Sequence, residues 1–446
     1  MKLKTSVLSL GVLASCLAVG GVLCAHAQAT DAGVGAKASH KAAPFYLKDG
    51  DRVVFYGDSI TDQRLYTTYI ESYCLTRFPK KNFTFIHSGW GGDRVTGGGG
   101  GPIDRRLKRD VLIYKPTVVT ICLGMNDGSY GPFKQNVYDT YVNGYRHIIE
   151  TLLKELPGVR LTLLTASAYD DVTRNPNFPG GYNSTLVTLG EAVRQLAAEY
   201  NLLVADTNAP LVAALNRAET ADAPAAAKII ADRVHPGPGG HLVMASAVLK
   251  AWNAPSTVAD IEIDAAANRV VTQENTHITN LKVAGDSVSF THLDNSLPWA
   301  FDRDPERNAD VKLTLACTDI EAQFNRDVLK ITGLKAAHYQ VSVDGKPVGT
   351  VDATALAAGI DLAGIPALPT NQQSALVLGL TRKHNDLHFR RWRQVQLTNG
   401  RNGLDDVPAD VQQQLTALDG QEADAIKELR QMLTPKPHHV ELMPAP

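Results

Sequence analysis

The sequence predicts an α/β fold for its first half, with a parallel sheet covered by helices on both faces. Between residues 44 and 254, short apolar runs alternate with longer amphipathic segments, a pattern typical of right-handed βαβ units. From about residue 255 the pattern changes to short strands spaced by turns, and beyond Asn371 it becomes helical again. We therefore expect an α/β domain at 44–254, a small β-sandwich at 255–355 and a helical segment at 356–435.

Residues 1–27 have the features of an export signal. Two lysines near the start precede an apolar run at 7–24, and a small-x-small motif at 25–27 is typical of a cleavage point. Two alternatives stay open: an uncleaved membrane anchor, for which the run is just long enough, and lipidation at Cys16 in a lipobox-like tetrapeptide. Cleavage predicts a periplasmic or secreted protein. No later apolar run could span a bilayer, so we expect no stable membrane insertion of the mature chain.

Five apolar runs predict the strands of the sheet, at residues 53–56, 83–86, 117–123, 161–165 and 202–205. The amphipathic segments between them predict helices at 65–77, 136–155, 184–200 and 239–252. Ligands bind at the carboxyl ends of the strands in sheets of this kind. Polar residues that directly follow a strand are therefore the first candidates for a functional site.

Composition excludes several classes of function. The chain has 446 residues and a net charge of -2, and it lacks a basic patch interleaved with aromatics, which argues against nucleic-acid binding. The densest basic cluster, at 105–109, is predicted to be a solvated helix face. Cys74, Cys122 and Cys317 lie outside the leader without CxxC spacing, so neither a disulfide framework nor a thiolate zinc site is expected. Cys122 lies in an apolar run and is predicted to be a buried, inert thiol.

Ser59 is the first candidate for chemistry. The apolar run at 53–56 breaks into the small polar turn Gly57-Asp58-Ser59, which presents a hydroxyl at a strand end. A serine becomes a nucleophile only when a base takes its proton and fixed donors receive the developing oxyanion. The sequence should therefore supply both kinds of partner further along.

A glycine-dense turn follows the second strand and includes Trp90 and Gly92. Glycine lets backbone N–H groups approach a bound oxygen closely, although a plain strand-to-helix turn would also explain the pattern. Trp90 could stack on a sugar ring, line an acyl pocket or pack in the core. The five glycines at 97–101 lack the Lys-Ser/Thr of a phosphate loop and are predicted to form a flexible loop.

Two further polar motifs complete the set. Asn126 directly follows the third strand, where an amide can donate to an oxyanion, a contact worth about 3 kcal/mol, or simply form a turn. Asp232 precedes His235 by three residues, so the carboxylate can curl back and orient the imidazole. His241 lies near His235, but no carboxylate cluster joins them at ligand spacing, so no metal site is expected.

On these residues the chain resembles the SGNH subgroup of GDSL-type serine hydrolases, over about residues 50–250. Gly57-Asp58-Ser59 is similar to the first sequence block of that family, Gly92 to the glycine of the second, 124–127 to the third and 232–235 to the last. The resemblance implies a three-layer flavodoxin-like sheet and ester hydrolysis through an acyl-enzyme. It implies no metal or organic cofactor.

The resemblance also assigns roles. Ser59 would be the nucleophile, His235 the base and later the acid, and Asp232 the group that orients His235. The oxyanion hole would use the backbone N–H groups of Ser59 and Gly92 together with the Asn126 amide.

Three other residues bear on this assignment. His87 departs from the pattern, because the second block often has Asn at that position, so the ordering of the glycine turn is less secure than the triad. Asp58 and Asp127 are expected to cap helices or stabilise turns rather than to react.

The expected substrate is a glycan ester or a small-molecule ester. The export signal favours extracellular or periplasmic polymers, so deacetylation or deacylation of a glycan is the preferred function. Lipase-like or arylesterase-like activity is one alternative. The other is a non-catalytic glycan-binding protein on the same fold.

In the second half, strands are predicted at 261–263, 270–271, 277–283, 287–291, 311–316, 328–331 and 339–343, with a hairpin at 343–346. They suggest a small accessory β-sandwich. It would either pack as an accessory or bind glycans through exposed Trp299, Phe301 or Tyr339. Amphipathic helices are expected to follow and to pack back on the preceding domains, and 436–446 is predicted to be a loose tail.

Overall fold

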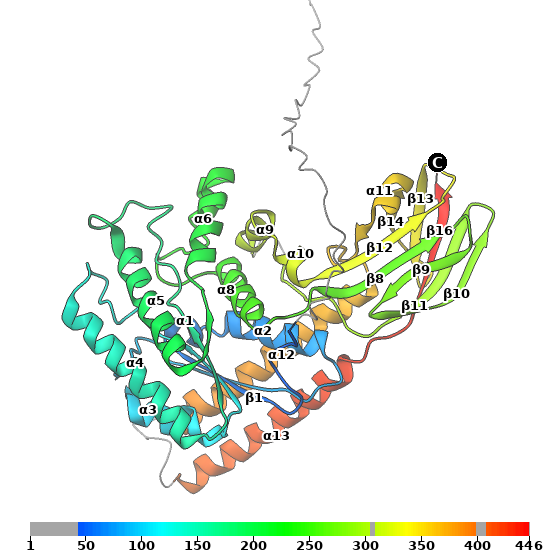
Figure 1. The fold of residues 1–446 in the computed structure, drawn as a ribbon. Coiled ribbons are helices and arrows are strands. Elements are labelled where there is room, and N and C mark those ends of the chain that lie inside the picture. The colour runs from blue at the N-terminus through cyan, green and yellow to red at the C-terminus, as the bar shows by residue number, and fades with distance from the viewer. Residues whose placement is uncertain (1–42, 304–307, 398–406, 446) are drawn as a thin grey trace, which may run out of the picture. The chain divides into compact units, whose positions relative to one another are not determined.

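The computed structural model describes residues 43–303, 308–397 and 407–445 (Figure 1). The predicted export signal, with its anchor and lipidation alternatives, lies outside these residues. From Pro44 onward the described chain forms one compact unit. Within the described ranges, no helix has the length and apolar character needed to cross a membrane.

A five-stranded parallel sheet forms the first half, as predicted. Its strands lie in the order β2 (Thr84–Gly89), β1 (Arg52–Gly57), β5 (Val118–Cys122), β6 (Arg160–Leu164) and β7 (Leu203–Ala205). Val53 pairs with Phe85 on one side and with Val118 on the other, which fixes the register of the central strand. All five residues of β5 are buried, because helices cover both faces of a parallel sheet.

The covering helices form two contacting sets (Figure 1). One set contains α2 (Leu65–Arg77) and α8 (Pro238–Ala251), and the other contains α3 (Ile103–Asp110), α4 (Gln135–Glu155) and α5 (Gly181–Tyr200). The shorter elements are α1 (Ser59–Asp62), η1 (Leu112–Tyr114), α6 (Ala209–Ala221) and α7 (Ala223–Ala226). The four helices expected from the sequence are all present, while α3 and α6 were not anticipated.

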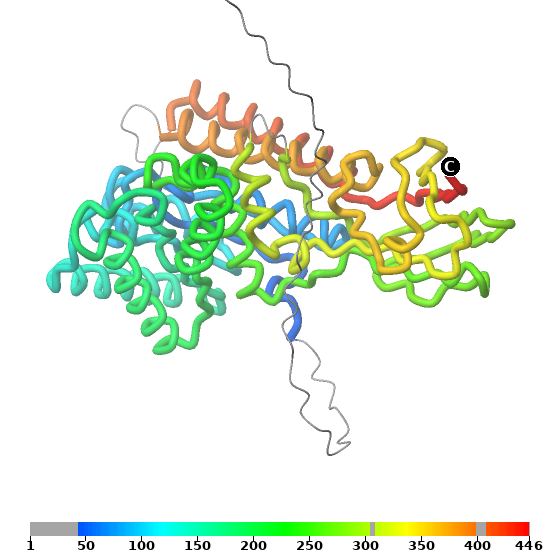
Figure 2. Tube along the Cα trace, turned by 90° about the horizontal axis from the view of Figure 1, so that it is seen from above, coloured from blue at the N-terminus to red at the C-terminus, as the bar shows by residue number. Residues whose placement is uncertain are grey.

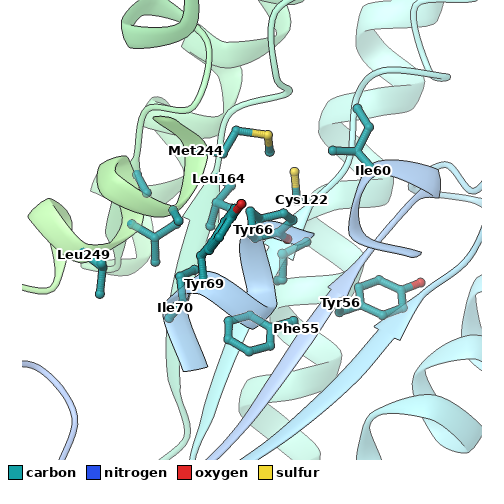
Figure 3. Packing of buried hydrophobic residues seen from close by; sticks show 14 of the residues in the cluster. Phe55, Tyr56, Ile60, Tyr66, Tyr69, Ile70, Cys122, Leu164, Met244 and Leu249 are labelled. Carbon is teal, nitrogen blue, oxygen red and sulfur yellow. The ribbon is translucent and has the colours of Figure 1, made fainter. Parts of the chain in front are cut away.

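The core of this half packs apolar and aromatic side chains between the sheet and its helices. Figure 3 shows Tyr66 of α2, Cys122 of β5, Leu164 of β6 and Met244 of α8 close to one another. Cys122 is 2% exposed, and burial raises the pKa of its thiol well above the ordinary value, as expected for an inert core cysteine. Cys74, Cys122 and Cys317 are all unpaired thiols.

The second half contains the predicted β-sandwich. One sheet has the order β10 (Thr276–Ala284), β11 (Ser287–Asp294), β16 (His438–Ala445), β13 (His338–Val343) and β14 (Lys346–Asp352). The other has the order β15 (Ile360–Asp361), β12 (Arg326–Thr332), β8 (Thr257–Asp264) and β9 (Arg269–Glu274). Apolar residues of both sheets share one core. The hairpin between β13 and β14 turns at Asp344 and Gly345, both with positive φ, as such tight turns require.

Two sequence expectations for this half were wrong. The C-terminal residues are no loose tail, because β16 pairs with both β11 and β13 at the centre of its sheet. The strand expected at 311–316 is instead α9 (Ala309–Ala316), which packs on α8 and buries Val311 and Thr314 on one face. Short apolar runs of this kind fit either period, and tertiary packing decides between them.

The aromatic side chains considered for a glycan platform are buried. Trp299 is 1% exposed, Phe301 8% and Tyr339 0%, which rules out an exposed platform and supports the packing alternative. Trp299 donates from Nε1 to the Tyr69 carbonyl at 3.0 Å. The segment that follows β11 and contains Trp299 is thereby attached to α2.

Two long helices of the C-terminal segment lie against the α/β half, as expected. They are α12 (Pro369–Phe389) and α13 (Ala409–Met432), which run side by side in Figure 2, with the π-helical segment η2 (Arg390–Gln396) following α12. The remaining short helices are α10 (Ile320–Phe324) and α11 (Ala353–Ala358). Asn385 of α12 donates to Thr68 and Glu71 of α2 at 2.9 and 3.0 Å.

A buried charge network strengthens this docking. Burial favours the neutral form of Glu71, but hydrogen bonds from His384 and His87 outweigh it and lower its pKa to about 2. Burial likewise opposes the charge of His384, yet Glu422 and Glu71 raise its pKa to about 10. A cationic imidazole on α12 therefore lies between carboxylates of α2 and α13.

Candidate active site

Ser59 lies at the turn where β1 passes into α1. The carboxylate of Asp58 accepts from the Ile60 N–H at 3.0 Å and caps this short helix, as predicted. Asp58 is 1% exposed. Burial is the main factor that raises the pKa of Asp58 to about 8, and the charges of Asp127 and Asp93 act in the same direction. Ser59 itself is partly exposed at the end of a buried strand.

His235 and Asp232 lie within hydrogen-bonding reach of Ser59. The His235 Nε2 atom is 2.8 Å from Ser59 Oγ, and His235 Nδ1 is 2.7 Å from Asp232 Oδ2. With the Nδ1 proton donated to the carboxylate, the Nε2 lone pair faces the serine hydroxyl. This arrangement suits removal of the hydroxyl proton.

The loop that carries His235 is held by its own backbone. Asp232 Oδ1 accepts from the N–H groups of Val234 and His235 at 2.9 and 2.7 Å, and Arg233 has a φ of 72° at the turn. Partial burial would raise the pKa of Asp232, but these hydrogen bonds and the His235 ring outweigh it and lower that pKa. Asp232 therefore stays ionised near neutral pH and can orient the imidazole.

The glycine turn lies on another side of Ser59. A methyl group added at Gly91 would lie 4.0 Å from Ser59 Cβ, so this backbone passes close to the hydroxyl-bearing residue. Gly92 has a φ of +75° and is exposed. A non-glycine residue would be strained in that conformation.

Asn126 is fixed in one amide orientation next to this turn. Its Nδ2 donates to the Asp93 carbonyl at 3.0 Å, and its Oδ1 accepts from the Tyr130 hydroxyl at 2.9 Å. The second Nδ2 hydrogen has no acceptor among the described residues, so it can serve an incoming oxygen. The structure thus brings Asn126 to the same turn as Gly91 and Gly92.

Tyr130 was not identified from the sequence. It is 42% exposed, and both it and Ser129 adopt positive φ values of 56° and 55°. Such backbone is uncommon for a tyrosine and is found where surrounding structure enforces it. The sequence signal that could have identified Tyr130 was an aromatic residue four positions after Asn126.

Asp127 stabilises the turn as expected, because its carboxylate accepts from the Val95 N–H at 2.9 Å.

The basic cluster at 105–109 is only in part the solvated helix face that the sequence predicts, because Arg105 and Lys108 are exposed but Arg106 and Arg109 are buried. Arg106 is fully buried and Arg109 is 4% exposed. Arg106 pairs with Asp93 at 2.5 Å and with Asp110, and it donates to the Ser88 carbonyl at 2.8 Å. Buried guanidinium groups need such partners, and the partners lie in the glycine turn and at the end of α3.

Trp90 is partly buried, and its ring packs against charged and aromatic side chains. The Arg393 guanidinium lies 3.5 Å from its ring centroid, Arg109 lies 4.9 Å away, and Trp392 meets it edge-on at 5.7 Å. These contacts fit the packing alternative better than a sugar-stacking role.

The glycine run at 97–101 also packs here, instead of forming the expected flexible loop. It forms the hairpin of β3 (Gly97–Gly98) and β4 (Gly101–Pro102). A methyl group at Gly100 would collide with the Arg106 side chain, and one at Gly99 would crowd Trp90. The glycines therefore allow close packing over Trp90 and Arg106.

Two histidines considered from the sequence have other partners. His87 is 2% exposed and bonds to Thr67 and Glu71, so it supports the docking of α12 and not the glycine turn. His241 accepts from the Tyr66 N–H and lies 2.9 Å from Gln63, and burial lowers its pKa to about 3. Across the described ranges, no group of three or more His, Cys, Asp or Glu is placed to hold a metal ion.

A cavity of about 540 Å³ lies away from Ser59. It is bordered by the edge strand β2 and by α12 and α13, with His384, Glu422 and Tyr114 in its wall. Neither Ser59 nor His235 lines it. The geometry that suits catalysis is therefore at the exposed carboxyl edge of the sheet and not in this cavity.

Comparison with known proteins agrees with this geometry. Residues 55–243 match the model of the GDSL-like lipase/acylhydrolase family. An acetylxylan esterase of Geobacillus stearothermophilus is 29% identical over 223 residues, which cover 46% of this chain and 94% of that protein.

A solved structure, described as BT4096, a gut microbial diltiazem-metabolizing enzyme, is similar over 90% of this chain and 98% of its own, with 27% identity and a TM-score of 0.77. That likeness extends beyond the α/β half to the β-sandwich and the C-terminal helices. The strand order, the Ser59 turn and the family match lead to one conclusion. Residues 55–243 form a domain of the GDSL-like lipase/acylhydrolase family, and the protein is an ester-hydrolysing enzyme.

Proposed function

We propose that Ser59 is the nucleophile of an exported esterase that removes acetyl or similar small acyl groups from glycans. The observation that carries the proposal is the continuous hydrogen-bonded relay from Ser59 Oγ to His235 Nε2 and from His235 Nδ1 to Asp232. This is the arrangement that activates a serine towards a carbonyl carbon.

Acylation begins when Ser59 Oγ attacks the ester carbonyl and His235 Nε2 takes the hydroxyl proton. The imidazolium that forms is stabilised by Asp232, whose lowered pKa keeps it anionic. The same proton then passes to the departing alkoxide, and the alcohol leaves. The acyl group remains on Ser59 as an ester.

Deacylation repeats the sequence with water. His235 removes a proton from a water molecule, which attacks the acyl carbon, and then returns the proton to Ser59 Oγ. The carboxylic acid leaves, and the free serine is restored.

The tetrahedral oxyanion of both steps needs donors that are already in place. We assign these to the backbone N–H groups of Ser59 and Gly92 and to the second amide hydrogen of Asn126. The Tyr130 and Asp93 contacts that fix this amide support the assignment, because a donor held in advance needs no reorganisation during the reaction.

Site exposure supports a bulky substrate. The side chains of His235 and Asp232 are 34% and 57% exposed, so an ester carried on a polymer can reach Ser59 at the surface. The relationship to an acetylxylan esterase supports an acetylated glycan. The leader at residues 1–27 supports a periplasmic or secreted location, where such polymers occur.

A serine-directed fluorophosphonate tests the nucleophile. We expect the wild type to be labelled at Ser59 and the Ser59→Ala and His235→Ala variants to lose labelling while keeping the wild-type melting temperature. A folded wild-type protein that does not react would contradict the enzymatic proposal and favour a binding protein on the same fold.

A substrate panel tests the acyl group. Acetylated xylo-oligosaccharides should be hydrolysed faster than p-nitrophenyl esters of long chain length, judged by kcat/KM. Faster hydrolysis of long acyl chains would replace the glycan assignment by a lipase-like one, whereas labelling of Ser59 would still support the nucleophile.

A further inference from the structure

Two residues of the C-terminal segment contact the glycine turn beside Ser59. They are Trp392 and Arg393, in the π-helical segment η2 that follows α12. Widened helical turns of this type are often found at functional sites. Figure 2 shows α12, in orange, along one side of the blue and cyan elements of the α/β half. The side-chain contacts show what this segment does there.

Arg393 makes two contacts with the glycine turn and one with Asp62 of α1. Its Nη1 donates to the Gly89 carbonyl at 3.1 Å and to Asp62 Oδ1 at 3.3 Å, and its guanidinium stacks 3.5 Å from the Trp90 ring centroid. Only 18% of the side chain is exposed. A planar guanidinium can make all three contacts at once, which an ammonium cannot.

Asp62 links Arg393 to the next residue of the turn. Burial raises the pKa of Asp62, whereas the charge of Arg393, the charge of Arg64 and a hydrogen bond from the Gly91 N–H favour its ionised form. Arg393 therefore supports the carboxylate that holds the Gly91 backbone. A methyl group at Gly91 would lie 4.0 Å from Ser59 Cβ, so this residue is next to the proposed nucleophile.

Trp392 joins a second set of contacts to the same turn. Its Nε1 donates to Asp110 at 2.8 Å, and Asp110 pairs with Arg106. Arg106 in turn pairs with the Asp93 carboxylate at 2.5 Å. The Asp93 carbonyl accepts from the Asn126 amide, so the chain of contacts ends at a proposed oxyanion donor.

We propose that Arg393 is a positioning residue for ester hydrolysis, which holds the Gly89–Asp93 turn so that its N–H donors face the oxyanion. Trp392 supports the same turn through Asp110 and Arg106. This inference rests on the proposed function of Ser59. It assigns the C-terminal helices a part in the chemistry, although neither residue touches the reacting atoms.

The expected loss of activity follows because oxyanion donors act only when they are placed accurately. A displacement of about 1 Å can cost about 100-fold in rate. The donors act mainly on the transition state, so misplacing them lowers kcat more than it changes KM. A residue with a purely structural role would instead lower the amount of folded enzyme and leave kcat per active site unchanged.

The experiment compares Arg393→Ala with Arg391→Ala, a control on the same helical turn. Within the described part of the chain, Arg391 pairs with Asp419 of α13 and donates to Gln396, and it does not bond to the glycine turn. The active-site concentration is titrated with a fluorophosphonate, and kcat is expressed per titrated Ser59. We expect Arg393→Ala to lower kcat by about 10-fold to 100-fold, with KM changed by less than about 3-fold.

Two further variants refine the result. Arg393→Lys keeps the charge and can reach Gly89 or Asp62, so it should recover part of the lost kcat. Trp392→Phe keeps the ring but loses the bond to Asp110, and should lower kcat by about 3-fold to 10-fold. If Arg393→Ala fails to fold, the Lys and Phe variants carry the test.

The inference is overturned if the kcat per site of the folded Arg393 variants stays within about 2-fold of wild type, or if Arg391→Ala loses as much as Arg393→Ala. The nucleophile proposal is judged separately. If Ser59→Ala keeps its activity, the proposed function fails; if Ser59→Ala is inactive while the Arg393 variants are normal, only the positioning role fails.

Discussion

The two sides of Ser59 are built in different ways. On the base side, Asp232 and His235 are three residues apart in one loop, and their side chains are 57% and 34% exposed. On the oxyanion side, Asp93 of the glycine turn pairs with Arg106, and the side chains of both are 0% exposed. Trp392, which completes that support through Asp110, is 282 residues further along the chain than its partner.

This contrast shows where rigidity is supplied. A base that moves a proton can lie in a short loop, because its hydrogen bonds to backbone and carboxylate fix it locally. Gly92, one of the assigned oxyanion donors, has no side chain to anchor it, so the position of its N–H depends on what packs behind the turn. Mutations on the two sides should therefore separate activity from stability.

The largest expected effect is on the base side. His235→Ala should lower kcat by about 10⁴-fold or more, because the proton acceptor is lost. Since the side chain is partly exposed, the melting temperature should change by no more than about 2 °C. Steady-state kinetics and thermal melts measure the two quantities. A large drop in melting temperature would show that the base side is also structural.

The next effect is on the buried side. Arg106→Ala removes the partner of two buried carboxylates, Asp93 and Asp110, and should lower the free energy of unfolding by about 3–5 kcal/mol. Urea unfolding measures this. As a control, the exposed neighbour Arg105→Ala should change stability by less than about 0.5 kcal/mol. Equal stability of both variants would mean that the buried pairs do not support the turn.

A third prediction concerns the docking of α12 and its dependence on pH. The folded-state pKa of His384 is raised from 6.5 to about 10, so its stabilisation is complete below pH 6.5 and is lost as the pH rises through about 10. The pKa of Glu71 is lowered from 4.5 to about 2, so its contribution is complete above pH 4.5 and is lost as the pH falls towards 2.

His384→Asn removes the basic group that titrates in the alkaline range. The variant should be less stable than wild type by about 3 kcal/mol near pH 6, and the difference should shrink towards about pH 10. Thermal melts across this range measure the effect. A difference that is independent of pH would show that His384 is not cationic in the folded protein.

The smallest expected effect is at Tyr130. Tyr130→Phe loses the hydroxyl that donates to Asn126 but keeps the ring, so kcat should fall by about 3-fold to 10-fold, the value of one neutral hydrogen bond. KM for a small ester should be unchanged. An unaltered kcat would mean that the Asp93 carbonyl alone orients the amide.

Local signals explain how much of the fold could be predicted. The helix expected at 65–77 has the bounds of α2, because an apolar strand, a periodic segment and a terminal turn follow each other within a few residues. The residues Ser59, Asp232 and His235 come together as the family resemblance implies, and their roles stay a prediction that labelling tests. Strand β16 was missed because prolines lie beside it and within it, and proline argues against a central strand.

Contacts that exist only in the folded chain explain what could not be predicted. Arg106 and Arg109 have the composition of a solvated face, and only their contact with Asp93 and Asp110 makes burial possible. Arg393 is likewise one charge among many in its helix until the fold places it over Trp90. Arg393 and Gly89 are 304 positions apart, whereas Arg106 is 13 positions from Asp93 and 4 from Asp110.

The most direct test of the account is a crystal structure of the phosphonylated enzyme. The adduct imitates the tetrahedral intermediate, with one phosphonyl oxygen in place of the oxyanion. We predict phosphorus bonded to Ser59 Oγ and that oxygen about 2.7–3.1 Å from the Ser59 N, Gly92 N and Asn126 Nδ2 atoms. An adduct on another residue, or an oxygen turned to solvent away from Gly92 and Asn126, would contradict the account.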